Sequence, residues 1–223
     1  MADFIMIGGH GKVAMRTTPR LVEEGHTVTA VIRKGEQVQE VEAVGAKALL
    51  LDIENATIND LADAFRGKDA VIWAAGAGGG NPQRTYAVDK DAAQRSIDAA
   101  VQAGVDRYVL ISYAGAGKDH GVSEDSSFFP YAESKSATDA YLRDSGLKYT
   151  ILGPGMLTLE DPTSKIRIAP ETGSAESAEG GRDTSRSNVA EAILVALEED
   201  ATIGQTIDFY DGDTDIRELF RSL

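Results

Sequence analysis

The chain opens with a short apolar stretch that runs directly into a glycine-rich turn and then into a helical segment. Ile5-Met6-Ile7 precede Gly8-Gly9-His10-Gly11-Lys12-Val13-Ala14. Gly8 allows a tight turn, Gly11 allows close approach to a phosphate, and the small Ala14 lets the helix pack close to a sheet. Free amides and aligned peptide dipoles at the helix start attract an anion. The turn therefore predicts a binding site for the pyrophosphate of a dinucleotide.

Apolar strand-like runs alternate with amphipathic helical segments as far as Pro154. Strands are expected over Phe4–Ile7, Thr27–Ile32, Lys47–Leu51, Ala70–Ala74, Arg107–Ser112 and Lys148–Leu152. Helices are expected in the gaps, the first from Lys12 to Glu24, where Pro19 should kink or locally break it. Alternation of this kind predicts an α/β fold with a doubly wound, mostly parallel sheet.

The alternating pattern weakens after Pro154. Glu171–Ser187 is rich in Ser, Gly, Glu and Thr and is predicted to be an exposed, mobile loop. A helix over Asn188–Glu199, a strand around Gln205–Tyr210 and a short terminal helix capped near Asp213 are then expected.

Nothing in the composition divides the chain, so residues 1–223 are expected to form one domain. With 223 residues, 42% of them hydrophobic, the chain can bury a core of that size. Segments 154–187 and 200–223 are expected to supply substrate-side loops and a small C-terminal lobe.

Charge and cysteine content exclude several classes of function. The net charge of −14 argues against nucleic acid or an anionic membrane as a partner, because either would be repelled. The chain has no cysteine, which rules out disulfides and thiolate chemistry, and His10, His26 and His120 are too scattered to predict a metal site. No signal peptide or membrane-spanning stretch is recognised. We expect a cytoplasmic protein that binds a small molecule.

The end of the second expected strand distinguishes between the two nicotinamide dinucleotides. An acidic residue there would accept hydrogen bonds from a free ribose 2′-hydroxyl, but the strand ends in Ile32-Arg33-Lys34. Arg33 can bind a 2′-phosphate with two hydrogen bonds, and Lys12 in the turn could add a third positive charge. The pattern favours NADP over NAD, with solvated surface cations as the alternative interpretation.

Two further segments follow expected strands at the same edge of the sheet. Asp52 and Ile53 could flank the adenine, although Asp52 could equally cap a helix. Ala74-Ala75-Gly76 keeps side chains small where a dinucleotide would cross the sheet edge, and a simple loop is the alternative.

A phenol and an ammonium lie four residues apart in Tyr131-Ala132-Glu133-Ser134-Lys135. On a helix beginning after Pro130 they share one face. A nearby cation stabilises a phenolate and so lowers the phenol pKa from about 10 toward the range useful for proton transfer. Ser112, at the end of the fifth expected strand, could donate a hydrogen bond to a substrate carbonyl.

Taken together, these motifs resemble the short-chain dehydrogenase/reductase superfamily, in its atypical or extended NAD(P)-binding branch, over nearly the whole chain. The shared stretches are Gly8-Gly9-His10-Gly11-Lys12-Val13-Ala14, Arg33, Ala74-Ala75-Gly76, Ala103–Ser112, the Tyr131/Lys135 pair, Gly153-Pro154-Gly155 and Ser185–Ala190. The resemblance implies a Rossmann fold with a nicotinamide cofactor. The cofactor-binding residues expected on these grounds are Gly8, Gly9, His10, Gly11, Lys12, Val13, Arg33, Lys34, Asp52, Ile53, Ala74, Ala75, Gly76, Tyr131, Lys135, Gly153, Pro154 and Gly155.

The same resemblance implies a Ser-Tyr-Lys catalytic site. Tyr131 would transfer a proton, Lys135 would lower its pKa and hold the nicotinamide ribose, and Ser112 would polarise the substrate. Gly153-Pro154-Gly155 would lie beside the nicotinamide, and Met156 and Leu157 would help to shape the substrate pocket. The asparagine-rich motif of classical members is replaced here by Gly76-Ala77-Gly78-Gly79-Gly80-Asn81.

The leading hypothesis is an NADP-dependent oxidoreductase acting on a small carbonyl, alcohol or quinone-like substrate. The alternatives are a non-enzymatic NADP(H)-binding redox sensor and a nucleotide-sugar epimerase or dehydratase, against which the short C-terminal portion argues. Arg84, Arg167 and Arg182 are interpreted as solvated surface residues rather than contacts for an anionic substrate. A homodimer could form through helices over Thr85–Ala103 and Tyr131–Ser145.

Overall fold

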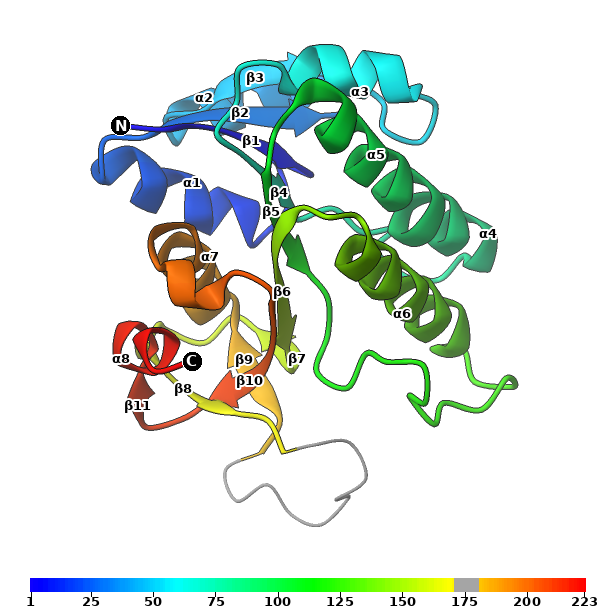
Figure 1. Ribbon diagram of the computed structural model, residues 1–223, viewed down its shortest axis with the longest axis vertical. Coiled ribbons are helices and arrows are strands. Elements are labelled where there is room, and N and C mark those ends of the chain that lie inside the picture. The colour runs from blue at the N-terminus through cyan, green and yellow to red at the C-terminus, as the bar shows by residue number, and fades with distance from the viewer. Residues whose placement is uncertain (171–180) are drawn as a thin grey trace.

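The computed structural model describes residues 1–170 and 181–223 as one large sheet with helices on both faces (Figure 1). The strands are β1 (Asp3–Ile7), β2 (Thr27–Ile32), β3 (Lys47–Leu50), β4 (Ala70–Trp73), β5 (Arg107–Ile111), β6 (Lys148–Pro154), β7 (Met156–Thr158), β8 (Lys165–Ile168), β9 (Asp183–Ser185), β10 (Gln205–Asp211) and β11 (Thr214–Asp215). The helices are α1 (Ala14–Glu23), η1 (Gly35–Gln37), α2 (Val38–Ala43), α3 (Ile58–Phe65), α4 (Pro82–Thr85), η2 (Tyr86–Ala92), α5 (Ala93–Ala103), α6 (Phe129–Asp144), α7 (Arg186–Glu198), η3 (Asp200–Thr202) and α8 (Ile216–Arg221).

The main sheet has the strand order β11-β8-β10-β6-β5-β4-β1-β2-β3. All neighbours from β3 to β10 are parallel, whereas β8 runs antiparallel to β10 and β11 antiparallel to β8. From β1 the chain first builds toward β3 on one side, then resumes at β4 on the other side of β1. A crevice therefore opens at the carboxyl ends of β1 and β4, where doubly wound sheets bind ligands.

Side chains of β1 alternate between two separate hydrophobic clusters. Phe4 and Met6 are buried with Leu21 of α1 and with residues of α7, while Ile5 and Ile7 are buried with residues of α3 and α5. Figure 1 shows the consequence, with α1, α7 and α8 on one face of the sheet and α3, α5 and α6 on the other. Because both faces are covered, the central strands β1, β4 and β5 contain continuous apolar runs rather than an alternating pattern.

The expected strands before Pro154 are confirmed, Thr27–Ile32 with the bounds that the pattern predicts. The local break expected at Pro19 is not found, because α1 continues through that residue. The terminal helix α8 is capped by Asp215, whose carboxylate accepts hydrogen bonds from the amides of Arg217 and Glu218, rather than near Asp213. The helix after β4 contains the π-helical stretch η2, which a periodicity of 3.6 residues does not reveal.

The predicted mobile loop over Glu171–Ser187 is also partly wrong. Asp183–Ser185 form β9, which pairs with β7 in a two-stranded sheet, and α7 begins at Arg186. Thr184 and Ser185 are buried. The hydroxyl of Thr184 accepts a hydrogen bond from the amide of Gly155, and that of Ser185 donates to the carbonyl of Glu160, so both hydroxyls have partners without water. Residues 171–180 of that prediction lie outside the described residues.

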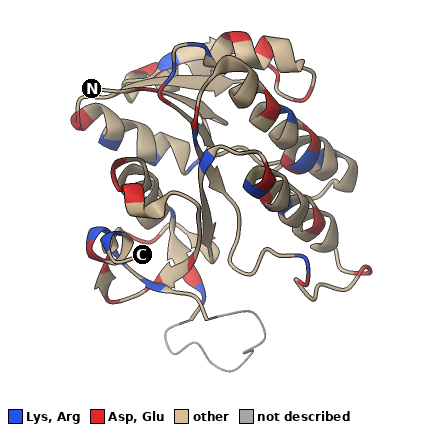
Figure 2. Cartoon of the chain, viewed as in Figure 1, with Lys and Arg blue, Asp and Glu red and all other residues tan. Residues whose placement is uncertain are grey.

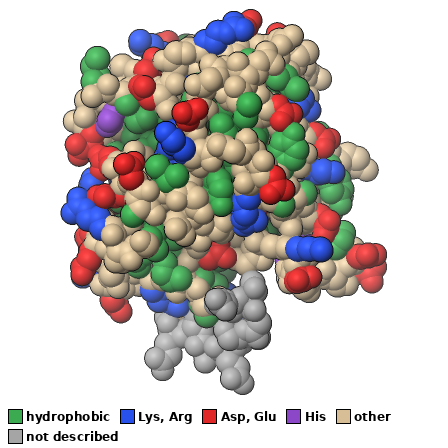
Figure 3. All heavy atoms as spheres, in the orientation of Figure 1, with side chains coloured by type: hydrophobic (Ala, Val, Ile, Leu, Met, Phe, Trp, Pro, Cys, Tyr) green, Lys and Arg blue, Asp and Glu red, His purple; other side chains and the backbone are tan. Residues whose placement is uncertain are grey.

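Charged side chains are spread over the helices and loops rather than gathered on one element (Figure 2). The face seen in Figure 3 intersperses acidic, basic and hydrophobic side chains. Within the described residues, no helix is long and apolar enough to cross a membrane, and no group of three potential metal ligands is found.

Candidate active site

The glycine turn after β1 is held tightly against the neighbouring strands. Gly8 has a φ of +79°, and a Cβ added there would lie 2.7 Å from the Cα of Ala75. A Cβ on Gly9 would lie 2.5 Å from the Cβ of Ala30, and the amide of Gly11 donates to the carbonyl of Gly8 at 2.8 Å. Only glycine fits at Gly8 and Gly9 without moving backbone. The turn therefore exposes main chain, not side chain, at the start of α1.

Two cavities lie beside this turn and share the residues Ala74-Ala75-Gly76. The first, of about 310 Å³, is lined by Arg33 and Arg84 and is called here the arginine cavity. The second, of about 700 Å³, is lined by Tyr131 and Lys135 and is called the tyrosine cavity. Ala74-Ala75-Gly76 line both cavities, so an elongated ligand can cross the sheet edge past these small residues.

Most of the residues predicted to bind the cofactor line one or both cavities. Those that do so are Gly8, His10, Gly11, Val13, Arg33, Ile53, Ala74, Ala75, Gly76, Tyr131 and Lys135, together with the predicted catalytic residue Ser112. Those that line neither cavity are Gly9, Lys12, Lys34, Asp52, Gly153, Pro154 and Gly155. Gly9 nevertheless supports the turn through its close contact with β2.

A single carboxylate joins the two guanidinium groups of the arginine cavity. Oε1 of Glu54 accepts hydrogen bonds from Nη1 of Arg33 at 2.9 Å and from Nε of Arg84 at 3.0 Å. Arg84 is 36% exposed in its side chain, as a surface residue would be, yet it also spans from Glu54 to the carbonyl of Ala77 and lines the cavity. Lys34 instead pairs with Glu36 at 3.2 Å.

Asp52 stabilises a local turn through its side chain. Its carboxylate accepts hydrogen bonds from the amide of Glu54 at 3.2 Å and from the side chain of Asn55 at 2.7 Å. Of the two expected adenine-flanking residues, only Ile53 faces the cavity. The geometry therefore favours the interpretation of Asp52 as a capping residue, although it stabilises a turn rather than the start of a helix.

Three polar residues share one face of α6, of which Tyr131 and Lys135 line the tyrosine cavity and Asp139 does not. Tyr131, Lys135 and Asp139 are spaced four residues apart, which places them on successive turns of the same face. Lys135 is 1% exposed, and its ammonium donates to the carbonyl of Ile111. Asp139 is fully buried and accepts a hydrogen bond from Oγ of Ser112 at 2.7 Å. Asp139 was missed in the sequence, although its spacing from Lys135 was a usable signal.

This arrangement alters the expected role of Ser112. Its hydroxyl has one proton, which is directed at Asp139 rather than at the cavity. Burial raises the pKa of Asp139 to about 6, against the opposing effects of the Lys135 charge and the Ser112 hydrogen bond. A protonated Asp139 could donate to Ser112 and release the serine proton toward a ligand.

A second buried carboxylate reaches the tyrosine cavity from the π-helical stretch η2. Asp89 is 1% exposed, and one of its oxygens accepts the amide of Ala77 at 3.0 Å. The other oxygen has no hydrogen-bond partner among the described residues and lies near Gly76, where an added Cβ would be 3.2 Å away. Burial raises the pKa of Asp89, while the nearby Lys135 lowers it.

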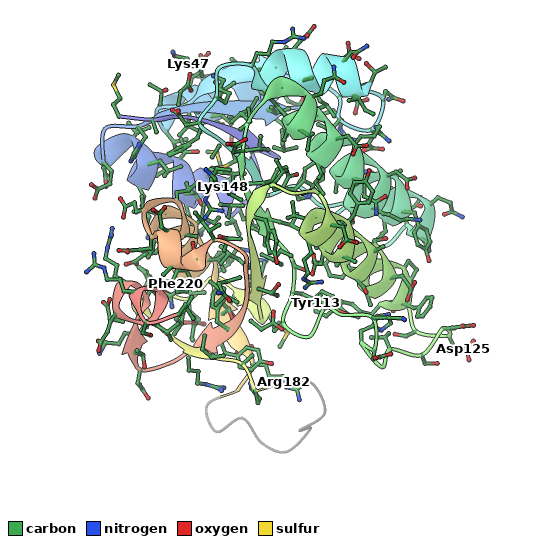
Figure 4. All side chains as sticks on the ribbon, viewed as in Figure 1. Lys47, Tyr113, Asp125, Lys148, Arg182 and Phe220 are labelled. Atoms are coloured by element: carbon green, nitrogen blue, oxygen red, sulfur yellow. The ribbon has the colours of Figure 1, made fainter. Side chains whose placement is uncertain are left out.

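Tyr131 is embedded in an aromatic group beside these carboxylates. Its ring centroid lies 5.6 Å from that of Tyr113 and 5.3 Å from that of Phe128. Figure 4 labels Tyr113 in the connection between β5 and α6. Burial raises the pKa of Tyr131, and the negative charges of Asp89 and Asp139 raise it further. The net lowering of the Tyr131 pKa that was expected is not found, because burial and the two carboxylates raise this pKa and the Lys135 ammonium is itself buried beside Asp89 and Asp139.

The residues at the end of β6 and just after it have a different role from the one expected. Gly153 and Gly155 pack against β10, where added Cβ atoms would collide with Asp208 and Tyr210 respectively. Leu157 lines the tyrosine cavity, as predicted, while Met156 is 69% exposed. The glycines at this position therefore permit close strand packing.

The described residues fit a nicotinamide dinucleotide. The glycine turn offers backbone amides to a pyrophosphate, and the small residues Ala74-Ala75-Gly76 leave a passage between the two cavities. The guanidinium groups lie at one end of that passage and the Tyr131/Lys135 pair at the other. This arrangement, with two guanidinium groups at one end and a phenol beside an ammonium at the other, is compatible with an elongated dinucleotide.

Comparison with known proteins agrees with this geometry. A family model described as NAD(P)H-binding matches residues 8–200. A Bacillus subtilis protein named "Uncharacterized sugar epimerase YhfK" is 34% identical over 98% of both chains. A solved Bacillus halodurans structure, "Putative NAD-dependent epimerase/dehydratase", superposes with a TM-score of 0.89 at 29% identity, covering 100% of both chains. The Lactococcus lactis oxidoreductase ylbE gives a TM-score of 0.85 at 28% identity, covering 99% of this chain and 96% of that one. The resemblance to the short-chain dehydrogenase/reductase superfamily is confirmed, and the chain belongs to the NAD(P)H-binding family.

Proposed function

We propose that the protein is an NADP-dependent reductase of a small carbonyl or quinone-like substrate, with Tyr131 as the proton donor. The observation that carries this proposal is the position of Tyr131 and Lys135 in a cavity of about 700 Å³ that continues past Gly76 to the glycine turn. A substrate in the tyrosine cavity would meet both the phenol and the cofactor end of the passage.

The environment of Tyr131 favours reduction over oxidation. Burial and two neighbouring carboxylates raise the pKa of Tyr131 above its usual 10.0, so the phenol keeps its proton at neutral pH. When bound, reduced nicotinamide supplies a hydride to the carbonyl carbon. Tyr131 then gives its proton to the oxygen that becomes the alcohol, acting as a general acid.

Lys135 stabilises the tyrosinate that forms when Tyr131 gives up its proton. It is the only lysine or arginine among the described residues that line the tyrosine cavity. Burial lowers the pKa of Lys135, and the negative charges of Asp89 and Asp139 oppose that effect, favouring the ammonium form that would stabilise a tyrosinate formed by proton transfer. The hydrogen bond to the carbonyl of Ile111 fixes the position of the ammonium.

The preference for NADP follows from the arginine cavity. Arg33 and Arg84 both present guanidinium nitrogens to one point, which is the geometry that a 2′-phosphate requires. His10 also lines this cavity, held by Gln37 at 3.1 Å and Glu40 at 2.9 Å. Lys12 and Lys34 do not line this cavity, so Arg84 takes their place in the proposal.

Consumption of NADPH with a panel of quinones, aldehydes and flavins tests this function. We expect turnover by the unmodified protein, a loss of about a hundredfold or more in Tyr131→Phe, and little change in NADPH binding. Binding titrations should give tighter binding of NADP than of NAD, and Arg33→Asp should reverse that preference. Tight NADPH binding without turnover of any substrate would favour a redox sensor instead.

An epimerase is the second candidate, because a curated relative with 34% identity is named as one. An enzyme acting on a nucleotide sugar needs cations for the sugar's diphosphate. The tyrosine cavity offers Lys135 alone, already bound to main chain, so the described residues favour the reductase. Epimerisation consumes no NADPH overall, so steady NADPH oxidation under a substrate excess separates the two.

A further inference from the structure

We propose that Glu54 is a specificity-determining residue whose carboxylate takes the place of the 2′-phosphate between Arg33 and Arg84. The inference rests on the proposed location of the adenosine end of the cofactor in the arginine cavity. One carboxylate oxygen of Glu54 accepts from both guanidinium groups, at 2.9 and 3.0 Å, and all three residues line the cavity. An internal anion thus occupies the point where the external anion would bind.

The backbone of Glu54 is fixed, which confines the exchange to its side chain. Nη2 of Arg95 donates to the carbonyls of Ile53 and Glu54, each at 3.0 Å, and its Nε donates to the carbonyl of Ala56 at 3.2 Å. The amide of Glu54 donates to Asp52. The turn therefore cannot move away as a unit, and the carboxylate can leave only by rotating about its own side-chain bonds.

Arg84 is anchored independently of Glu54. Its guanidinium also donates to the carbonyl of Ala77, and its amide donates to the side chain of Asn81 at 3.0 Å. Loss of the Glu54 charge should therefore leave Arg84 directed at the cavity. The carboxylate is not needed to hold this cation in position.

The two cofactors would make different demands on Glu54. The 2′-phosphate carries more negative charge than a carboxylate and cannot share the site with one, so binding of NADP must first break both arginine contacts. The ribose hydroxyl of NAD is neutral and leaves them intact. Glu54 should therefore weaken the binding of NADP selectively, which keeps a preference for NADP moderate.

The test compares Glu54→Gln with Glu36→Gln by calorimetric titration. Glu36 is the matched control, because the same charge is removed from an exposed carboxylate that pairs with Lys34 outside the cavity. The probes are NADP, NAD, adenosine 2′,5′-bisphosphate and AMP. Circular dichroism of each variant checks that the fold is retained, and no enzymatic activity is needed.

We expect Glu54→Gln to tighten the binding of NADP and of the bisphosphate about tenfold. In the unmodified protein two partly exposed ion pairs must break, and breaking each one weakens binding a few-fold. The affinities for NAD and AMP should change by less than about twofold. Glu36→Gln should change the affinity for each of the four probes by less than about twofold. An equal change for NADP and NAD, weaker NADP binding, or the same effect in Glu36→Gln would overturn the proposal. Tighter binding of NAD than of NADP by the unmodified protein would refute the proposed cofactor preference, yet the shift in their ratio would still decide the role of Glu54.

Discussion

Asp139 offers a quantitative test of the buried network behind Tyr131. The carboxyl is fully buried on α6, accepts the hydroxyl of Ser112, and has a second oxygen without a partner among the described residues. Burial is the largest influence on this group and raises its pKa from 3.8 to about 6. The Asp139→Asn variant removes the charge and keeps an oxygen that can accept from Ser112, so it isolates the electrostatic effect.

The sign of the effect follows from proton binding. A raised folded-state pKa means that the folded protein binds this proton more tightly than the unfolded chain does. The stabilisation is fully present below pH 3.8 and is lost as the pH rises through about 6. The complete loss is about 3 kcal/mol, because one pKa unit corresponds to about 1.4 kcal/mol. About 2 kcal/mol of it falls between roughly pH 4.5 and 7.5.

Urea denaturation across this pH range measures the effect. The free energy of unfolding of Asp139→Asn, minus that of the unmodified protein, should rise by about 2 kcal/mol from roughly pH 4.5 to 7.5. The attraction between Asp139 and Lys135 exists only when Asp139 is ionised, and it is already part of the folded-state pKa of about 6. Asp144→Asn, which alters an exposed carboxyl at the end of the same helix, is the control and should follow the unmodified protein. A difference for Asp139→Asn that stays flat within about 0.5 kcal/mol would refute the reasoning.

Three other outcomes are expected. In Tyr131→Phe, the rate of NADPH oxidation should fall about a hundredfold or more with the NADPH dissociation constant nearly unchanged, and a parallel rise in that constant would speak against a proton donor. Gly8→Ala should cost more than about 3 kcal/mol in thermal denaturation, whereas Gly78→Ala should cost about 1 kcal/mol. Both glycines have a φ of +79°, but only at Gly8 would the Cβ meet backbone, so equal costs would contradict the close-approach argument. Ser96→Ala should cost about 1–3 kcal/mol in urea unfolding, because the buried hydroxyl of Tyr108 loses its partner at 2.6 Å, and an unchanged midpoint would disprove this.

Local sequence was sufficient for the frame of the molecule. Apolar runs such as Val71-Ile72-Trp73 can be buried only as strands covered on both faces, and the glycines after β1 need a backbone that other residues cannot adopt. These requirements act within a few residues of each other, so they can be read directly from the chain. The Tyr131/Lys135 pair was equally legible, because its spacing follows from the helix alone.

What the tertiary structure decided is the electrostatic environment of those same groups. Glu54 and Arg84 meet although they are thirty residues apart, and Asp89 reaches Lys135 only because a π-helical stretch packs against α6. Lys135 was expected to lower the pKa of Tyr131, yet burial and two carboxylates raise it. The sequence by itself identified Tyr131 and Lys135, the pair on which the proposed chemistry depends. Their burial and their charged neighbours depend on long-range packing, and these set the direction in which each pKa is shifted and the partners of Arg33 and Arg84.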